Sequence, residues 1–371
     1  MKIISVEALH LRLPNIEAKA DGTQEVVIAR VTTDDGLVGH GEVVSCATVA
    51  RAIIEAPRSA PFRHGLGAAI IGLDPLNPEA RWHDMYEATR WYGRRGCALH
   101  AISAVDTALW DITAQAHNLP CHELWGTKRR SIRAYASVLF PDTPSDAARL
   151  AESLVAKGFT AVKFGWGRFG RDRDHDRAVL RAIRSAIGDS VDLMVDAGRV
   201  WTLEEALARV DELFSEFGVL WLEEPLHEDN LGGYATLALR APGRIATGET
   251  EETFGQFETL LSLGVAVVQP DIGRAGGPTI CLRISAAAAA RKAWCVPHCF
   301  GSGVNLASSI HWAAAAEEAP FIEYPFTASP LRNDLTAGIP EMRNGYVELP
   351  QGSGLGISLD PAVIARFRVK D

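Results

Sequence analysis

At 371 residues, the chain is longer than a single hydrophobic core usually supports, which predicts two domains. Its 47% hydrophobic and 22% charged residues are typical of a soluble globular protein. The net charge of −9 argues against a nucleic acid or an anionic membrane as partner, because both favour a basic face. An anionic substrate must therefore be attracted by local cations or by a metal ion.

The N-terminal stretch MKIISVEALHLRLP alternates like a strand and lacks the apolar core and cleavage site of a signal peptide. No run of about 18 apolar residues is present in the sequence. The six cysteines form no CxxC pair, which indicates free thiols in a reducing compartment. We therefore expect a cytoplasmic protein that does not bind membranes.

The first 125 residues form one predicted α+β domain. Residues 1–12 and 25–44 read as antiparallel strands, with the Asp-Asp-Gly at 34–36 supplying a hairpin turn. Residues 97–117 then place apolar side chains at helical spacing on one face.

From about residue 131, strands and helices alternate strictly. Thr143 before Pro144 predicts one helix start, and Thr202 with Glu205 predicts a capping box at another. The eight predicted strands are IRAYASVL, FTAVKF, DLMVD, LWLEE, RIATGE, VAVVQPD, AWCVPH and PFIE. This spacing favours an α/β fold, a closed (β/α)8 TIM barrel over residues 126–325. Residues 326–371 contain two more alternating stretches, GYVELP and GISLD, which we expect to return to the first domain.

A polar side chain ends each of the last six apolar runs, at intervals of 22 to 27 residues. These side chains are Asp196, Glu223, Glu249, Asp271, His298 and Glu323. Because one strand, one helix and two loops take about that many residues, the spacing delivers one polar group per repeat to the same rim of the barrel.

The first three of them, Asp196, Glu223 and Glu249, end adjacent predicted strands. Three hard anionic oxygens suit Mg²⁺, whereas zinc would call for His or Cys ligands. One rim carboxylate could simply cap a helix, but three at consecutive strand ends indicate a metal site. We predict that they bind Mg²⁺.

Asp271 and His298 end the sixth and seventh strands and are therefore neighbours. A carboxylate beside an imidazole fixes its tautomer and raises its basicity, which predicts a general base. The alternative is a buried structural histidine. Glu323 would donate a hydrogen bond if the surrounding carboxylates raise its pKa, or would form a loop salt bridge.

Lys163 ends the second strand, across the barrel mouth from strands six and seven. It could pair with a substrate carboxylate, act as a base, or balance the metal-site acids. The following GWGRFG, with Gly165, Gly167 and Gly170, matches G-x-G-x-x-G between a strand and a helix. The acids of RDRDHD would repel a pyrophosphate, so we predict an active-site loop in which Trp166 contacts substrate.

These residues lie in segments that resemble the enolase superfamily, and within it the mandelate racemase subgroup. The resemblance covers nearly the whole chain through ISAVDTALWDI, LWGTK, VDAG, WLEEP, TGE, QPDIGRAGG, PH and the late Glu323. It implies a modified (β/α)7β barrel, an N-terminal capping domain whose segments near 14–24 and 46–65 select the substrate, and a homo-oligomer. It also implies Mg²⁺ on the three carboxylates, a catalytic Asp271–His298 dyad, and a hydrogen bond from Glu323 to the enolate side of the intermediate.

Two departures from the subgroup matter. The second strand commonly ends Lys-x-Lys, but this chain has Lys163-Phe164-Gly165 and lacks the second lysine. The third strand often reads Asp-x-Asn, but here it reads Asp196-Ala197-Gly198. A two-base racemase needs groups on both faces of the substrate carbon, and His298 clearly supplies one.

The one-sided site favours Mg²⁺-dependent dehydration of an aldonic or aldaric acid to a 2-keto-3-deoxy acid, a lyase reaction. The alternatives are a racemase, epimerase or cycloisomerase with Lys163 as second base, and a non-catalytic metal-binding scaffold. The stretch Trp91–Arg95 could place arginines near a distal carboxylate, or could form a helix face or a subunit contact.

Overall fold

The chain begins with a three-stranded antiparallel sheet, β1 (Ile3–Arg12), β2 (Glu25–Thr33) and β3 (Val38–Val43). The computed structural model describes residues 1–18, 22–61 and 63–370. The predicted turn joins β2 to β3, with Gly36 at a φ of 93° and the Thr33 N–H donating to Leu37 O at 3.0 Å. The short 3-10 helix η1 (Gly22–Gln24) precedes β2. The helices of this capping lobe are α1 (Ala47–Glu55), α2 (Leu66–Ile70), α3 (Pro78–Gly93), α4 (Cys97–Ala116) and α5 (Cys121–Leu124).

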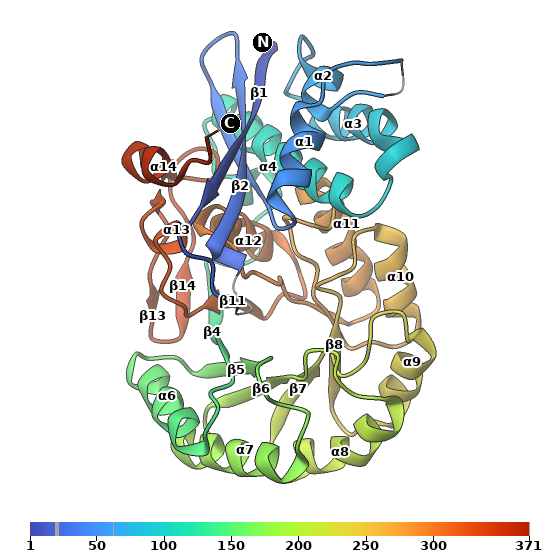
Figure 1. Cartoon of the computed structure of the whole chain (residues 1–371), viewed down its shortest axis with the longest axis vertical. Helices are drawn as coiled ribbons and strands as arrows, with labels where there is room; N and C mark the ends of the chain where they lie inside the picture. Colours follow the sequence, from blue (N-terminus) through green and yellow to red (C-terminus); the bar gives the residue numbers. More distant parts are fainter. Residues whose placement is uncertain (19–21, 62, 371) are drawn as a thin grey trace.

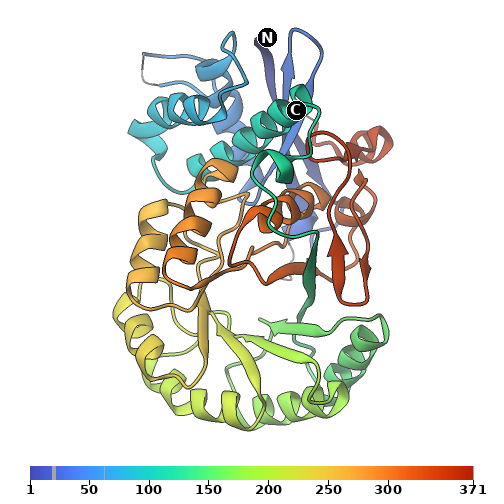
Figure 2. The ribbon, with the colours of Figure 1, turned by 180° about the vertical axis from the view of Figure 1, so that it is seen from behind.

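Helix α4 joins the lobe to the barrel, and Figure 2 shows it between the two. Two glycines of β3 allow its close approach, because a Cβ at Gly39 or Gly41 would lie 2.0 Å from a carbonyl oxygen of α4. Toward the barrel, Asp106 of α4 accepts a 2.9 Å hydrogen bond from the N–H of Thr279 in α11 (Gly277–Ala290). The lobe is therefore fixed to the barrel through a buried helix.

Residues 126–325, all of which the structure describes, form eight parallel strands with seven helices between them (Figure 1). The strands are β4 (Ser131–Leu139), β5 (Ala161–Gly165), β6 (Asp192–Asp196), β7 (Val219–Glu223), β8 (Arg244–Thr247), β9 (Val267–Val268), β10 (Trp294–Cys295) and β11 (Phe321–Pro325). With α11, the helices are α6 (Pro144–Ala156), α7 (Arg173–Ile187), α8 (Leu203–Ser215), α9 (Leu231–Arg240), α10 (Phe254–Ser262) and α12 (Gly303–Ala315). Strand β11 pairs with β4, and the Cys295 N–H donates to Glu318 O at 2.8 Å across the remaining gap. The predicted caps at Thr143 and Thr202 are both present.

Each strand, or its direct extension, contributes one buried side chain to an apolar cluster inside the barrel. These residues are Tyr135, Ala161, Met194, Trp221, Ala246, Val267, Val296 and Phe321. Because side chains alternate along a strand, the residue two positions later points to the same side. Those residues are Ser137, Lys163, Asp196, Glu223, Gly248, Gln269, His298 and Glu323. Period-two alternation therefore places a ring of polar side chains, interrupted by Gly248, above an apolar floor.

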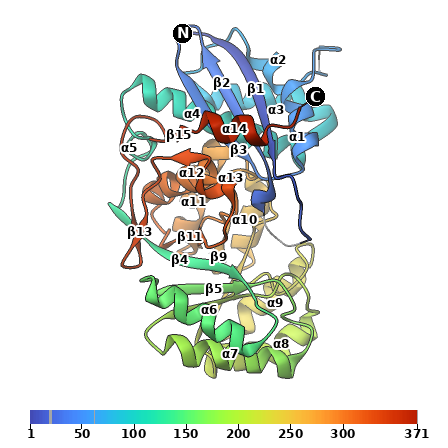
Figure 3. The same cartoon turned by 60° about the vertical axis from the view of Figure 1, so that its left-hand side comes forward.

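The C-terminal segment contains α13 (Pro330–Asn333), β12 (Thr336–Ala337), β13 (Met342–Arg343), β14 (Tyr346–Glu348), β15 (Ser358–Leu359) and α14 (Pro361–Phe367). Helix α14 packs on β1, and the Val369 N–H after it donates to His10 O at 2.9 Å (Figure 3). The GYVELP stretch does not return to the lobe as expected. Its strand β14 pairs antiparallel with residues 131–133, because β5 pairs with β4 only from Ala136 onward and leaves the start of that edge open. No helix in the described part of the chain is long and apolar enough to cross a membrane.

Candidate active site

Three carboxylates meet at the C-terminal rim of the barrel, as their spacing predicts. Asp196 and Glu223 end β6 and β7, and Glu249 lies two residues beyond β8. One oxygen from each lies within 4.8 Å of the others, and all three side chains are buried. Burial, followed by the negative charge of Glu223, raises the pKa of Asp196 well above its usual range. A site that crowds buried negative charge in this way favours a bound cation.

Lys163 lies between this cluster and Glu323. Its Nζ contacts Glu223 Oε1 and lies 2.8 Å from Glu323 Oε1. Burial opposes the charge on Lys163, but these two carboxylates raise its pKa well above its usual range. The ammonium group is therefore charged and shared between two carboxylates.

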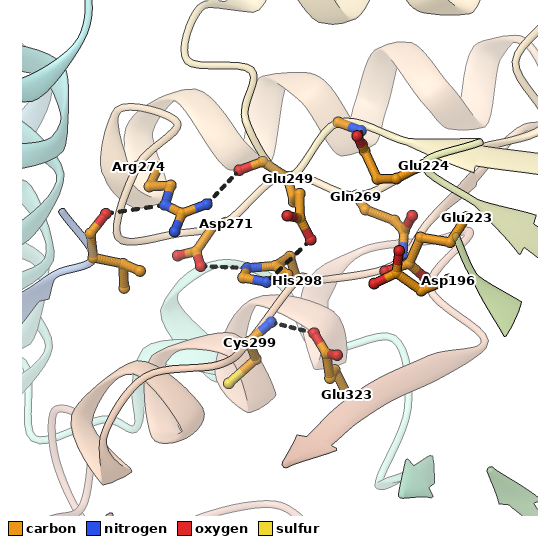
Figure 4. Close-up of polar contacts among 12 residues, drawn as sticks. Asp196, Glu223, Glu224, Glu249, Gln269, Asp271, Arg274, His298, Cys299 and Glu323 are labelled. Carbon is orange, nitrogen blue, oxygen red and sulfur yellow. Dashed lines mark hydrogen bonds and ion pairs between the residues drawn. The ribbon is translucent and has the colours of Figure 1, made fainter. Parts of the chain in front are cut away.

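Glu323 differs from its expected state. Burial acts to raise its pKa, but the Lys163 ammonium and then His298 lower the pKa below its ordinary value. Its other oxygen accepts a hydrogen bond from the Cys299 N–H at 2.7 Å (Figure 4). The condition for hydrogen-bond donation, a raised pKa, is therefore not met, and Glu323 instead forms a salt bridge with Lys163.

Asp271 and His298 come together beyond β9 and β10. The Asp271 carboxylate lies 2.6 Å from His298 Nδ1, and it also accepts hydrogen bonds from the Gly273 N–H at 2.7 Å and Asn305 Nδ2 at 3.0 Å. His298 Nε2 lies 3.4 Å from Glu249 Oε2 (Figure 4). Burial opposes protonation, but Glu249 and Asp271 raise the pKa of His298 to about 9. A cation on Glu249 would offset part of this effect.

A cavity of about 660 Å³ opens over these groups. His100 and Ser45 line it from the lobe, and Ser45 Oγ lies 2.8 Å from His100 Nδ1. The other ring nitrogen of His100 lies 3.3 Å from Glu252, which follows β8. The sequence indicates only weakly that His100 faces a cavity, because it shows no more than a polar residue within the apolar stretch 97–117. The cavity therefore has catalytic-type groups at its floor and hydrogen-bonding groups on its lobe side.

Comparisons with known proteins identify this architecture. The mandelate racemase / muconate lactonizing enzyme N-terminal domain matches residues 3–126, and the enolase C-terminal domain-like family matches residues 146–363. The chain belongs to the enolase superfamily. Both the resemblance and the fold expected from the sequence are confirmed.

Two relatives and one solved structure show which enzymes of this superfamily the chain is similar to. D-galactarolactone cycloisomerase of Agrobacterium fabrum is 33% identical over 359 residues, covering 93% of this chain and 92% of that protein. Arabinonate dehydratase of Saccharolobus solfataricus is 32% identical over 361 residues, covering 96% and 94%. The crystal structure of 3,6-anhydro-D-galactonate cycloisomerase from Zobellia galactanivorans has a TM-score of 0.90 and 29% identity, covering 100% of both chains. These relatives are lyases and isomerases, in agreement with the predicted enzyme class.

In this enolase-superfamily chain, Gly165 stands where the mandelate racemase subgroup commonly has the second lysine of Lys-x-Lys. It pairs with Asp196 across β5 and β6. A Cβ at Gly165 would lie 2.8 Å from both Asp196 Cβ and Asp196 Oδ2, which is closer than ordinary contact. In this conformation the position of the missing lysine has no room for a side chain.

The loop after β5 contributes Trp166 to the cavity wall. Trp166 has a φ of 56°, and the guanidinium of Arg199 lies 5.1 Å from its ring centroid. Arg199 follows β6, lines the same cavity and has its nearest ion-pair partner, Glu228, at 3.7 Å. No sequence pattern singled out Arg199, because its position depends on a left-handed backbone, with a φ of 65°.

The glycines of the same loop serve protein packing. A Cβ at Gly167 would lie 2.9 Å from Phe140 O, and one at Gly170 would lie 2.2 Å from Val200. The side chain of Asp172 caps α7 by accepting from the N–H groups of Asp174 and His175. A carboxylate therefore occupies the helix N-terminus that a pyrophosphate would need, which supports the rejection of a dinucleotide turn.

The lobe residues that line the cavity are Val44, Ser45 and His100. Among the described residues, none of 14–18, 22–24, 46–61 or 63–65 lines it, and 19–21 and 62 lie outside the described chain. Trp91–Arg95 also does not line it. Trp91 is 70% exposed, and Tyr92 donates to His64 O at 2.8 Å. The arginines of that stretch are therefore not placed to bind a substrate in this cavity.

Proposed function

We propose that the protein is a Mg²⁺-dependent dehydratase that converts an acid sugar into a 2-keto-3-deoxy acid. The observation that carries the proposal is the arrangement of the Asp271–His298 dyad beside three buried carboxylates, with Gly165 at the position of a second base. The named activities of the relatives, which act on sugar acids or their lactones, support the same substrate class.

The residues Asp196, Glu223 and Glu249 fit Mg²⁺. They offer hard carboxylate oxygens and no His or Cys, and their crowded charge is only partly balanced by Lys163. When bound there, Mg²⁺ would offset the negative charge that develops on the substrate carboxylate during proton removal.

His298 is proposed to move the proton. Its Nε2 takes the proton from the carbon α to the carboxylate, and Asp271 holds the opposite nitrogen and stabilises the resulting imidazolium. Nε2 then returns that proton to the departing β-hydroxyl, so that the C–O bond breaks and water leaves. The enol that remains tautomerises to the 2-keto-3-deoxy acid.

Lys163 and Glu323 are proposed to position the substrate. The Lys163 ammonium is already bound by Glu223 and Glu323, which favours charge balance and carboxylate binding over a role as base. Glu323 lies on the opposite side of Lys163 from the metal cluster, and its charged carboxylate is proposed to hold the Lys163 ammonium in place. It would hydrogen-bond the enolate side of the intermediate only after taking up a proton. Trp166 and Arg199 are proposed to contact the sugar chain from the loops after β5 and β6.

Cycloisomerisation is the second candidate, because one relative and one structural neighbour are named cycloisomerases. The test is incubation with Mg²⁺ and a panel of aldonic acids, aldaric acids and their lactones in D₂O. Formation of 2-keto-3-deoxy acids supports dehydration. Lactone conversion, or deuterium at the α-carbon without a keto acid, supports an isomerase. Neither exchange nor turnover in the Mg²⁺-bound protein would indicate a scaffold.

A further inference from the structure

A carboxylate of the capping lobe lies against the barrel beside the general-base dyad. Glu42, in β3, is only 3% exposed and forms three hydrogen bonds with the start of α12. Its Oε1 accepts from the Ser302 N–H at 2.8 Å, and its Oε2 accepts from Ser302 Oγ at 2.5 Å and from the Asn305 N–H at 2.9 Å. Gly301 leaves room for the Glu42 side chain, because a Cβ at position 301 would lie 2.6 Å from Glu42 Oε1.

These bonds complete the first turn of α12 with a group from another domain. The first N–H groups of a helix have no partner within the helix. Ser302 itself accepts from the Val304 N–H at 3.2 Å, while the Asn305 N–H depends on Glu42, 263 positions earlier in the chain. The position of Asn305 is therefore set partly by the docked lobe.

Asn305 leads directly to the dyad. Its Nδ2 donates to Asp271 Oδ1 at 3.0 Å, and Asp271 Oδ2 lies 2.6 Å from His298 Nδ1. Buried partners of this kind orient a catalytic imidazole through its carboxylate. The path from Glu42 to His298 runs through the backbone and side chain of Asn305 and then through Asp271, and all of these residues are buried.

A second connection from the same strand supports this view. Just after β3, Val44 O accepts from Arg274 Nε at 2.9 Å, and the Val44 N–H donates to Gly273 O at 3.3 Å. Arg274 also donates to Glu249 O at 2.9 Å (Figure 4). The end of β3 therefore holds the loops that carry Asp271 and Glu249 as well as the start of α12.

We propose that Glu42 is a positioning residue for the general base, acting through Asn305 and Asp271. The lobe then contributes to proton transfer as well as closing the cavity. The inference rests on the proposed function for its kinetic test, and on geometry alone for its spectroscopic test.

The first test is Glu42→Gln, which keeps the shape but turns one acceptor oxygen into a donor. The rate of α-proton exchange at saturating substrate should fall about 10- to 100-fold, while KM and the Mg²⁺-induced change in Tm stay unchanged. Glu55→Gln is the matched control, since Glu55 accepts from the Ala8 N–H and pairs with Arg51 within the lobe. Equal exchange rates in Glu42→Gln and the wild type would overturn the proposal.

A double-mutant cycle separates positioning from general destabilisation. If Glu42 acts through Asn305, Glu42→Gln combined with Asn305→Ala should be about as slow as the slower single variant. Effects that multiply would overturn the proposed path.

A proton NMR signal tests the geometry without turnover. The proton in the 2.6 Å Asp271–His298 contact should resonate far downfield, and it is assigned by its loss in His298→Asn. The proposal expects this signal to shift or to exchange faster with water in Glu42→Gln, but not in Glu55→Gln. An unchanged signal would overturn the inference even if no substrate is turned over. Failure of the wild type to exchange any panel member would instead contradict the proposed function.

Discussion

Gly165→Ala is a minimal test of why the site has room for only one base. The added methyl would lie 2.8 Å from Asp196 Cβ and Oδ2, whereas ordinary contact begins at 3.4 Å, so one side must move by about 0.6 Å. Mg²⁺ sites tolerate displacements of only about 0.2 Å from ideal ligand distances. Overpacking strain of about 1–3 kcal/mol, if relieved by moving Asp196, corresponds to about 5- to 150-fold weaker Mg²⁺ binding.

Isothermal titration of the metal-free protein with Mg²⁺ measures this loss directly. Gly255→Ala is the matched control, because a Cβ at Gly255 of α10 meets no atom within 4 Å. Wild-type Mg²⁺ affinity in Gly165→Ala would refute the reasoning, since the rim would then have room for a side chain at the position of the absent lysine.

Three further changes test the electrostatics of the chain. Mg²⁺ at about 100 times its Kd should stabilise the protein by about 2.7 kcal/mol, and Asp196→Asn should abolish the resulting rise in Tm; a rise that survives would place the metal elsewhere. Lys163→Met leaves two buried carboxylates without their cation, so it should lower the free energy of unfolding in EDTA by about 3–5 kcal/mol, partly restored by Mg²⁺. Denaturant titration that finds no loss would count against that ion pair. Burial raises the pKa of Asp106 to about 8, so the folded state retains a proton that the unfolded state loses near pH 4. Stability from this group should therefore fall as pH rises from about 4 to 8, and Asp106→Asn should flatten that decline in urea titrations at pH 5 and 8. An unchanged pH dependence in Asp106→Asn would contradict the assignment.

Local patterns were sufficient to predict the barrel and part of its polar ring. Caps such as Thr143 and Thr202 mark helix starts through contacts within three residues, which a sequence displays directly. Asp196, Glu223, His298 and Glu323 lie two positions beyond a residue of the barrel floor, as period-two alternation requires, whereas Glu249 and Asp271 lie in the loops just beyond the ring.

Contacts between distant segments could not be predicted in this way. The pKa of Glu323 is lowered, not raised, because Lys163 reaches it across the barrel. Strand β14 pairs with β4 because of an open edge that only the assembled barrel reveals. His100 and Glu42 come from lobe elements whose sequences show no sign of the site, and only docking of the lobe brings them there.

The central claim is that His298, held by Asp271, removes the proton α to a substrate carboxylate. The most direct measurement follows deuterium incorporation and keto-acid formation from acid sugars in D₂O with Mg²⁺, comparing the wild type with His298→Asn. We predict turnover by the wild type and neither exchange nor product in the variant, with Mg²⁺ binding retained. Exchange at the wild-type rate in His298→Asn would contradict it.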